Sequence, residues 1–129
     1  MKILQPPGWA APRGYVNGVA ARGTLVFVAG QIGWNATGQF ESDDLVDQVR
    51  QALLNVRAVL AEAGATPEHL VRMTWYLTDK RAYLARAKAI GAAYRETMGS
   101  YAVAMSAVQV AGLIEDRALV EIEATAVVP

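Results

Sequence analysis

The segment Ala104–Pro129, AMSAVQVAGLIEDRALVEIEATAVVP, carries the strongest indication of the fold. It predicts two β-strands joined by a loop, the first over Met105–Val110 and the second over Leu119–Val127. Strand side chains alternate between two faces, so the second strand assigns one set to a core: Val120, Ile122, Ala124, Ala126 and Val128. The opposite face then carries Glu121 and Glu123, in a segment that is otherwise β-branched and apolar.

The other predicted strands are apolar on both faces. Thr24–Ile32 places Leu25, Phe27 and Ala29 on one side and Val26 and Val28 on the other, and Val71–Thr78 is similarly two-sided. A sheet with helices on one side needs only one apolar face, and this chain offers only two good helices. We therefore expect the second face to be an interface between copies of the chain, with Glu121 and Glu123 buried or half-buried near it.

The remaining elements follow from local signals. Tyr15–Ala20 and Thr24–Ile32 flank a short turn ending at Gly23 and predict a β-hairpin, preceded by an irregular arm that is rich in Pro and Gly. A helix is expected to begin at Asp43 or Asp44, because an apolar stripe at spacings of three and four follows: Leu45, Val49, Leu53, Val56 and Leu60.

A second helix is expected over about Lys80–Met98, capped by Asp79 and ended by Gly99. The predicted order is β-β-α-β-α-β-β, without an internal repeat or a linker. The sequence thus predicts a single α+β domain over residues 1–129, with two helices on one face of a sheet.

Composition narrows the class of function. The chain has 129 residues, 12 basic and 12 acidic, with a formal net charge of zero, which argues against nucleic acid or an anionic membrane surface as a partner. It has no cysteine, which excludes disulfide and thiolate chemistry and fits a cytoplasmic location. Neither a signal peptide nor a span of roughly 20 apolar residues is expected.

Metal and cofactor sites are not expected. His69 is the only histidine, and no cysteine accompanies it, so we expect an exposed or capping residue. The glycines at 30, 33 and 38 do not form a phosphate-binding loop that leads into a helix. A capped helix start explains the three nearby acids, Asp43, Asp44 and Asp47.

Several separate segments resemble the RidA/YjgF family, the reactive intermediate deaminases that are also labelled endoribonuclease L-PSP. These are GYVNGV, LVFVAGQIGWNATGQF, QVRQALLNVRAVLAEAGA, VRMTWYLTD, SAVQVAGL and VEIEATAV, which cover nearly the whole chain in order. The resemblance implies a chorismate-mutase-like fold of the bacillus type and a homotrimer with an inner β-barrel and three inter-subunit clefts. It also implies hydrolysis of an enamine or imine, which releases ammonia and a 2-keto acid.

The resemblance assigns roles to particular residues. Tyr15 matches the cleft tyrosine of the family, and Glu121 matches the glutamate that positions the attacking water. The backbone of Gly30, Gln31 and Ile32 matches the strand end that lines the cleft. Ser106 matches the serine after the family's substrate-binding arginine.

The arginine itself is replaced by Met105, and its preceding proline is also absent. Ala87 stands where an asparagine is frequent. Methionine offers neither charge nor hydrogen-bond donors, and loss of a charged anchor from a partly desolvated cleft costs about 2–5 kcal/mol, or roughly 30- to several-thousand-fold. Arg13 and Arg117 are the candidate replacements.

Three hypotheses follow. The first is a trimer whose inter-subunit cleft binds a more apolar or less anionic small molecule and hydrolyses it with Glu121 and water, with Tyr15, Trp34 and Met105 as an apolar wall. The second is a non-catalytic trimer that senses or carries a metabolite. The third is a structural relic with an occluded cleft. Ribonuclease activity is not favoured, because the charge is neutral and no pair of histidines is present.

Overall fold

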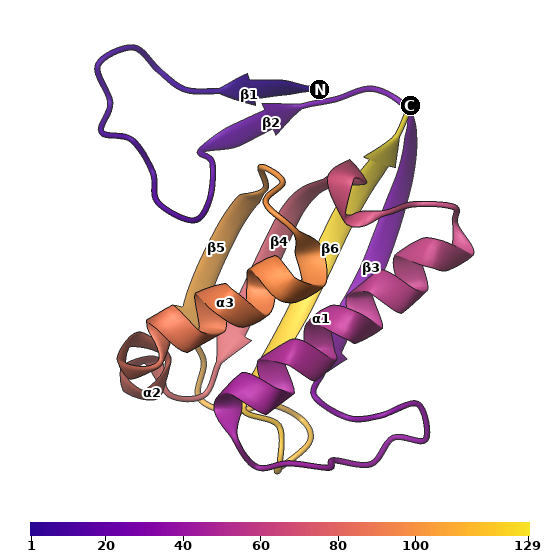
Figure 1. Cartoon of the computed structure of the whole chain (residues 1–129), viewed down its shortest axis with the longest axis vertical. Coiled ribbons are helices and arrows are strands. Elements are labelled where there is room, and N and C mark those ends of the chain that lie inside the picture. Colours follow the sequence, from indigo (N-terminus) through magenta and orange to yellow (C-terminus); the bar gives the residue numbers. More distant parts are fainter.

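A four-stranded sheet with the order β3-β6-β4-β5 forms the centre of the computed structural model, which describes all residues, 1–129 (Figure 1). Its strands are β3 (Thr24–Ile32), β4 (Leu70–Leu77), β5 (Ala104–Gln109) and β6 (Val120–Val128). Strand β6 pairs antiparallel with β3 and β4, whereas β4 and β5 are parallel. β3 and β5 are therefore the edge strands of this sheet.

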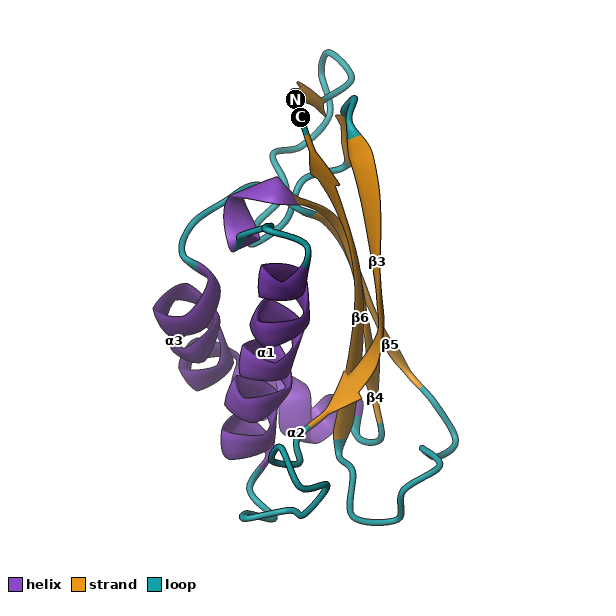
Figure 2. Cartoon of the chain, turned by 90° about the vertical axis from the view of Figure 1, so that its right-hand side faces the viewer, coloured by secondary structure: helices purple, strands orange, loops and turns teal.

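Helices cover only one face of the sheet. Helices α1 (Leu45–Glu62) and α3 (Ala87–Met98) pack on it, and the short α2 (Lys80–Ala85) lies beside them at one end (Figure 2). The core side of β6 is Val120, Ile122, Ala124 and Ala126, all buried as the alternation predicts. The predicted α+β class, with helices on one face of the sheet, is confirmed.

Local signals place α1 where the sequence predicts it. The Asp44 side chain accepts a hydrogen bond from the Asp47 N–H at 3.1 Å and caps the helix. The predicted apolar stripe is buried against β3 and β6. Gly64, with φ 68°, follows the helix end in the left-handed conformation that glycine adopts without strain.

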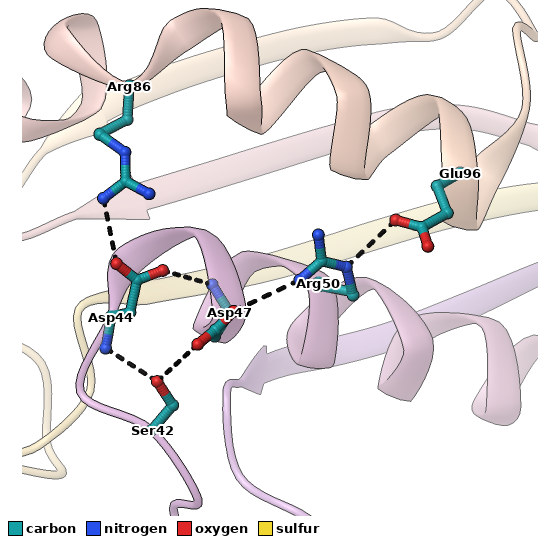
Figure 3. A network of polar contacts seen from close by, with 6 residues as sticks. All are labelled: Ser42, Asp44, Asp47, Arg50, Arg86 and Glu96. Carbon is teal, nitrogen blue, oxygen red and sulfur yellow. Dashed lines mark hydrogen bonds and ion pairs between the residues drawn. The ribbon is translucent and has the colours of Figure 1, made fainter.

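Charged side chains join α1 to α3 (Figure 3). Arg86 contacts Asp44 at 3.0 Å, and this guanidinium, with the Asp47 N–H, lowers the pKa of the Asp44 carboxyl. Arg50 lies between Asp47, at 3.4 Å, and Glu96, at 3.1 Å. The acids at the start of α1 therefore serve as a cap and as ion-pair partners.

The predicted helix over Lys80–Met98 is divided into two. Arg86 separates α2 from α3 with φ −108° and ψ 15°, outside the helical region. The stretch contains neither proline nor a central glycine at the break, so local propensity does not cause it. At the break the Arg86 side chain contacts Asp44 at the start of α1, and α3 then runs along the sheet (Figure 1).

The predicted hairpin of Tyr15–Ala20 with β3 is wrong. The strand there is shorter, β2 (Gly18–Ala20), and it pairs with β1 (Lys2–Leu4) in a separate two-stranded sheet. β1 lies within the arm that we expected to be irregular. The long strand β3 pairs with β6 instead, which gives its backbone a longer partner than three-residue β2 offers.

No helix lies on the opposite side of the four-stranded sheet, which we call the bare face (Figure 2). Its strand residues include Leu25, Phe27, Thr74, Tyr76, Ser106, Val108, Glu121 and Glu123. Phe27 is 73% exposed and Leu25 58% on edge strand β3, and Val108 is 44% exposed on the opposite edge strand β5. Glu121 is half-buried, whereas Glu123 is exposed.

Candidate functional site

A β-bulge brings Glu121 against Gly30. The register between β3 and β6 shifts between Val28 and Gln31, so the backbone around Gly30 departs from regular pairing. A Cβ atom at Gly30 would lie 2.7 Å from Glu121 Cδ and 2.8 Å from its Oε2. The Glu121 side chain therefore lies across the Gly30 backbone, and only glycine leaves room for it there.

The Glu121 carboxylate has no partner within the chain. It makes no hydrogen bond and no ion pair, although it is half-buried. Its neighbour Glu123 differs, because the Tyr76 hydroxyl donates to Glu123 Oε1 at 2.6 Å. This hydrogen bond is the main reason why the pKa of Tyr76 is raised. Of the two carboxylates on the bare face, Glu121 is thus the one free to act on another molecule.

A buried amide fixes the beginning of β6. Gln48 Nε2 donates to the carbonyl oxygens of Ser42 and Arg117, each at 3.0 Å, and Gln48 Oε1 accepts from the Leu119 N–H at 2.8 Å. Gln48 is completely buried, so these bonds form away from water and are strong. They hold the chain immediately before β6 and so position Glu121, two residues farther on.

A groove of about 810 Å³ lies on the helical side, at the edge strand β5. Its walls come from β5, α3, the end of α2 and residues 13–16, and we call it the aromatic groove because Tyr15, Trp75, Tyr83, Tyr94 and Tyr101 line it together with Met105. The segment 13–16 is held there by the Val16 N–H, which donates to the Val103 carbonyl oxygen at 3.0 Å.

The predicted site residues fall on two opposite faces of the sheet. Tyr15 and Met105 line the aromatic groove. Ser106 follows Met105 on the same strand and lies opposite Thr74 on the bare face, together with Glu121. Within one chain, therefore, Met105 and Glu121 do not line a common cavity.

The other predicted cleft residues lie at the end of β3. The Gln31 side chain donates to the Ala29 carbonyl oxygen at 3.1 Å, and Ile32 is buried. Trp34 packs on Phe40, with 6.0 Å between ring centroids. Asn55 Nδ2 donates to the Ile32 and Trp34 carbonyl oxygens at 3.0 and 2.8 Å, which ties this strand end to α1.

The two arginines that were candidates to replace the missing substrate-binding arginine lie in different places. Arg117 binds Asp43, with Nε at 3.0 Å and Nη2 at 2.9 Å from Oδ1, and lies over the Phe40 ring. Arg13 lines the aromatic groove. A third arginine, Arg95 of α3, also lines it and was missed by sequence reasoning, since helical spacing alone does not show which face of α3 meets β5.

His69 belongs to the short helical turn that precedes β4. His69 Nδ1 accepts from the Thr66 N–H at 3.0 Å, so the predicted capping role is confirmed. No group of three histidine, cysteine or acidic side chains is arranged to hold a metal ion. None of the helices combines the length and apolar character that crossing a membrane requires.

The α+β fold, with helices on one face of a four-stranded sheet, is shared by known proteins. A family model described as endoribonuclease L-PSP matches residues 8–128. The RutC family protein slr0709 of Synechocystis is 37% identical over 131 residues, covering 100% of this chain and 98% of that protein. Escherichia coli TdcF, named as a reactive intermediate deaminase, is 37% identical over 128 residues, covering 98% and 95%.

Solved structures of the same family have the same fold. The Rid protein YyfB of Yersinia pestis has a TM-score of 0.87 and 32% identity, covering 98% of both chains. Escherichia coli TdcF with bound serine has a TM-score of 0.71 and 34% identity, covering 100% of both chains. The chain belongs to the RidA/YjgF family.

Proposed function

We propose that the chain forms a homotrimer whose inter-subunit clefts bind a small metabolite and hydrolyse it as an enamine or imine. Each cleft combines the aromatic groove of one subunit with Glu121 and the Gly30–Ile32 strand end of its neighbour. The observation that carries this proposal is the half-buried, unpaired Glu121 carboxylate on a face of the sheet that no helix of the chain covers.

The edges of the sheet support this arrangement. β5 borders the groove and β3 borders Glu121. Apart from the single bridge between Val16 and Ala104 at the start of β5, each is an edge that a second strand can cover. If β5 of one copy lies beside β3 of the next, three copies close a barrel with the bare faces inside. This arrangement covers Leu25 and Phe27, and it joins the two halves of the predicted site.

The proposed chemistry needs only a carboxylate and water. Glu121 accepts a proton from water as the water oxygen attacks the imine carbon, and the C=N bond becomes a C–N single bond. Glu121 returns this proton to nitrogen, which gives a neutral carbinolamine. Glu121 then transfers a second proton from the carbinol hydroxyl to nitrogen, and the C–N bond breaks as the C=O bond forms, which gives ammonia and a carbonyl compound. The Gly30 backbone beneath Glu121 keeps the carboxylate in place without a competing ion pair.

Freshly generated imines test this function. An amino acid oxidase produces them from apolar and acidic amino acids, and hydrolysis is followed by competition with semicarbazide trapping. Wild type is expected to accelerate hydrolysis, and Glu121→Gln to lose about 10²–10⁴-fold. Glu123→Gln, on the same face, is the matched control and is expected to retain the rate. Equal rates with and without wild-type protein would contradict the proposal.

Met105 supports one alternative, a non-catalytic trimer that binds or senses a metabolite. It leaves the groove without the strand arginine by which related deaminases grip a carboxylate. Met105→Arg, run beside wild type, separates the two functions. Activity only in Met105→Arg would mean that the cleft is intact but serves another ligand, whereas activity in wild type favours hydrolysis.

A further inference from the structure

The aromatic groove has an unusual concentration of rings. Four of the chain's five tyrosines line it, together with Trp75. Trp75 is 2% exposed, and the Tyr83 and Tyr94 rings each lie 6.3 Å from its ring, centroid to centroid. Flat aromatic walls favour a flat aromatic ligand, because offset and edge-on ring contacts add to the gain from apolar burial.

The groove is also positively charged. Arg13 and Arg95 line it, and no acidic residue does. Neither arginine takes part in an ion pair, whereas Arg50, Arg86 and Arg117 all pair with carboxylates. A groove that combines two free guanidinium groups with no carboxylate favours an anionic ligand.

Gly91 leaves room for the Arg95 side chain. A Cβ atom at Gly91 would lie 3.3 Å from Arg95 Nη1, so the guanidinium folds back along α3 over this glycine, which also lines the groove. Arg95 therefore supplies a charge from the helical wall of the groove. Met105, on the strand wall, supplies apolar surface instead.

The wall contains one unsatisfied donor. The Trp75 indole N–H is the only buried side-chain polar atom in the chain without a hydrogen-bond partner. Nearly all buried polar groups in folded proteins are paired, and this exception lies in the ring cluster that Trp75 forms with Tyr83 and Tyr94 beneath the groove surface. The neighbouring tyrosines add no negative charge, because burial raises the pKa of Tyr94 to about 12 and also raises the pKa of Tyr83.

We propose that the groove binds a small aromatic acid, with its ring against the tyrosine and Met105 walls and its carboxylate on Arg95, assisted by Arg13. This inference rests on the proposed function and narrows it, because the imine hydrolysed would be the one derived from an aromatic amino acid. Arg95 then anchors the carboxylate from helix α3, in place of an arginine on strand β5.

Three related compounds test the two halves of this ligand separately. Phenylpyruvate carries both the ring and the carboxylate, pyruvate lacks the ring, and phenylacetone lacks the carboxylate. Isothermal titration is expected to show that phenylpyruvate binds at least about tenfold more tightly than either, since each missing group forfeits its own contacts.

Arginine variants locate the carboxylate. Arg95→Gln is expected to weaken phenylpyruvate binding by about 10- to 100-fold, as loss of a hydrogen bond to a charged group does, and to leave phenylacetone unaffected. Arg22→Gln, an exposed arginine outside the groove, is the matched control. Equal binding of the three compounds, or full affinity in Arg95→Gln, would overturn the inference.

These equilibrium measurements do not depend on catalysis, so the two proposals can fail separately. Hydrolysis of imines by wild type without preference for the aromatic ones would leave the proposed function standing and refute the aromatic-acid site. Arg95-dependent binding of phenylpyruvate, without hydrolysis of any imine, would establish the site and refute the deaminase function.

Discussion

The two faces of the four-stranded sheet come from the same strands but differ in what covers them. On one face, Ile122 and Trp75 are buried under α1 and α3. On the bare face, Phe27 and Leu25 are mostly exposed, and Glu121 has no partner. Alternation distributes apolar side chains to both faces, but this chain has helices for only one. The covered face stabilises the fold, whereas the bare face is the surface that we propose contacts another copy.

The largest expected effect concerns association through the bare face. Phe27→Lys places a charge where three subunits would bury an aromatic ring, so it is expected to abolish the trimer. Sedimentation velocity should find wild type near three times the chain mass of 13.8 kDa and the variant near one.

Val59→Lys is the matched control for this experiment. Val59 is 39% exposed and lies on α1, away from the bare face, so the same charge there should leave the trimer intact. A monomeric wild type, or a trimeric Phe27→Lys, would refute the assignment of the bare face as an interface.

Truncating one apolar side chain on each face of the sheet compares how much each face contributes to the free energy of unfolding. Ile122→Ala leaves a cavity in a fully buried position and is expected to lower the free energy of unfolding by about 2–5 kcal/mol at any protein concentration. Leu25→Ala should cost little in dilute protein and more as the trimer forms, because only assembly buries Leu25. Urea unfolding at several protein concentrations measures both, and a concentration-independent loss in Leu25→Ala would argue against an interface there.

A smaller expected effect is a loss of folding stability at high pH, which should involve a tyrosine on the covered face more than one on the bare face. Burial on the helical side raises the pKa of Tyr94 to about 12, from an unfolded value near 10. Its contribution to stability is therefore complete below pH 10 and lost as the pH rises from 10 towards 12, a loss of about 2–3 kcal/mol.

Denaturant unfolding between pH 9 and 12 measures this loss, and Tyr94→Phe should remove it. Tyr76→Phe, on the bare face, should change the same profile much less. The pKa of Tyr76 is raised mainly by its hydrogen bond to Glu123, and this bond is exposed to solvent, which weakens its effect on stability. An alkaline profile of Tyr94→Phe that matches wild type would show that Tyr94 does not contribute.

Sequence reasoning succeeded where the signals are local. The cap at Asp44, the stripe from Leu45 and the glycine at 64 specify α1 within one stretch of chain. Alternation in β6 assigned the core residues from Val120 to Ala126, but not the strand end, where Val127 is buried and Val128 is half-buried. The pairing of β1 with β2 was missed because three-residue strands give almost no periodic signal. The break at Arg86 was missed because neither proline nor glycine marks it in the sequence.

The candidate site could be predicted only in part. Resemblance to the family selected Tyr15, Gly30, Met105 and Glu121, but not their distribution over two faces of the sheet. The contact of Glu121 with Gly30 depends on a β-bulge, which no local pattern specified. Arg95 joins the groove because α3 packs beside β5, a tertiary relation that the sequence alone did not show.

Subunit mixing tests the central claim, that the aromatic groove of one copy works with Glu121 of another. Glu121→Gln keeps the groove, and Ala107→Trp fills the groove but keeps Glu121. Each variant alone should be inactive on imines, and sedimentation should show that each remains a trimer. Trimers refolded from a mixture of the two should regain part of the wild-type rate, because some clefts combine an intact groove with an intact Glu121. An inactive mixture beside active wild type would contradict a site shared between subunits.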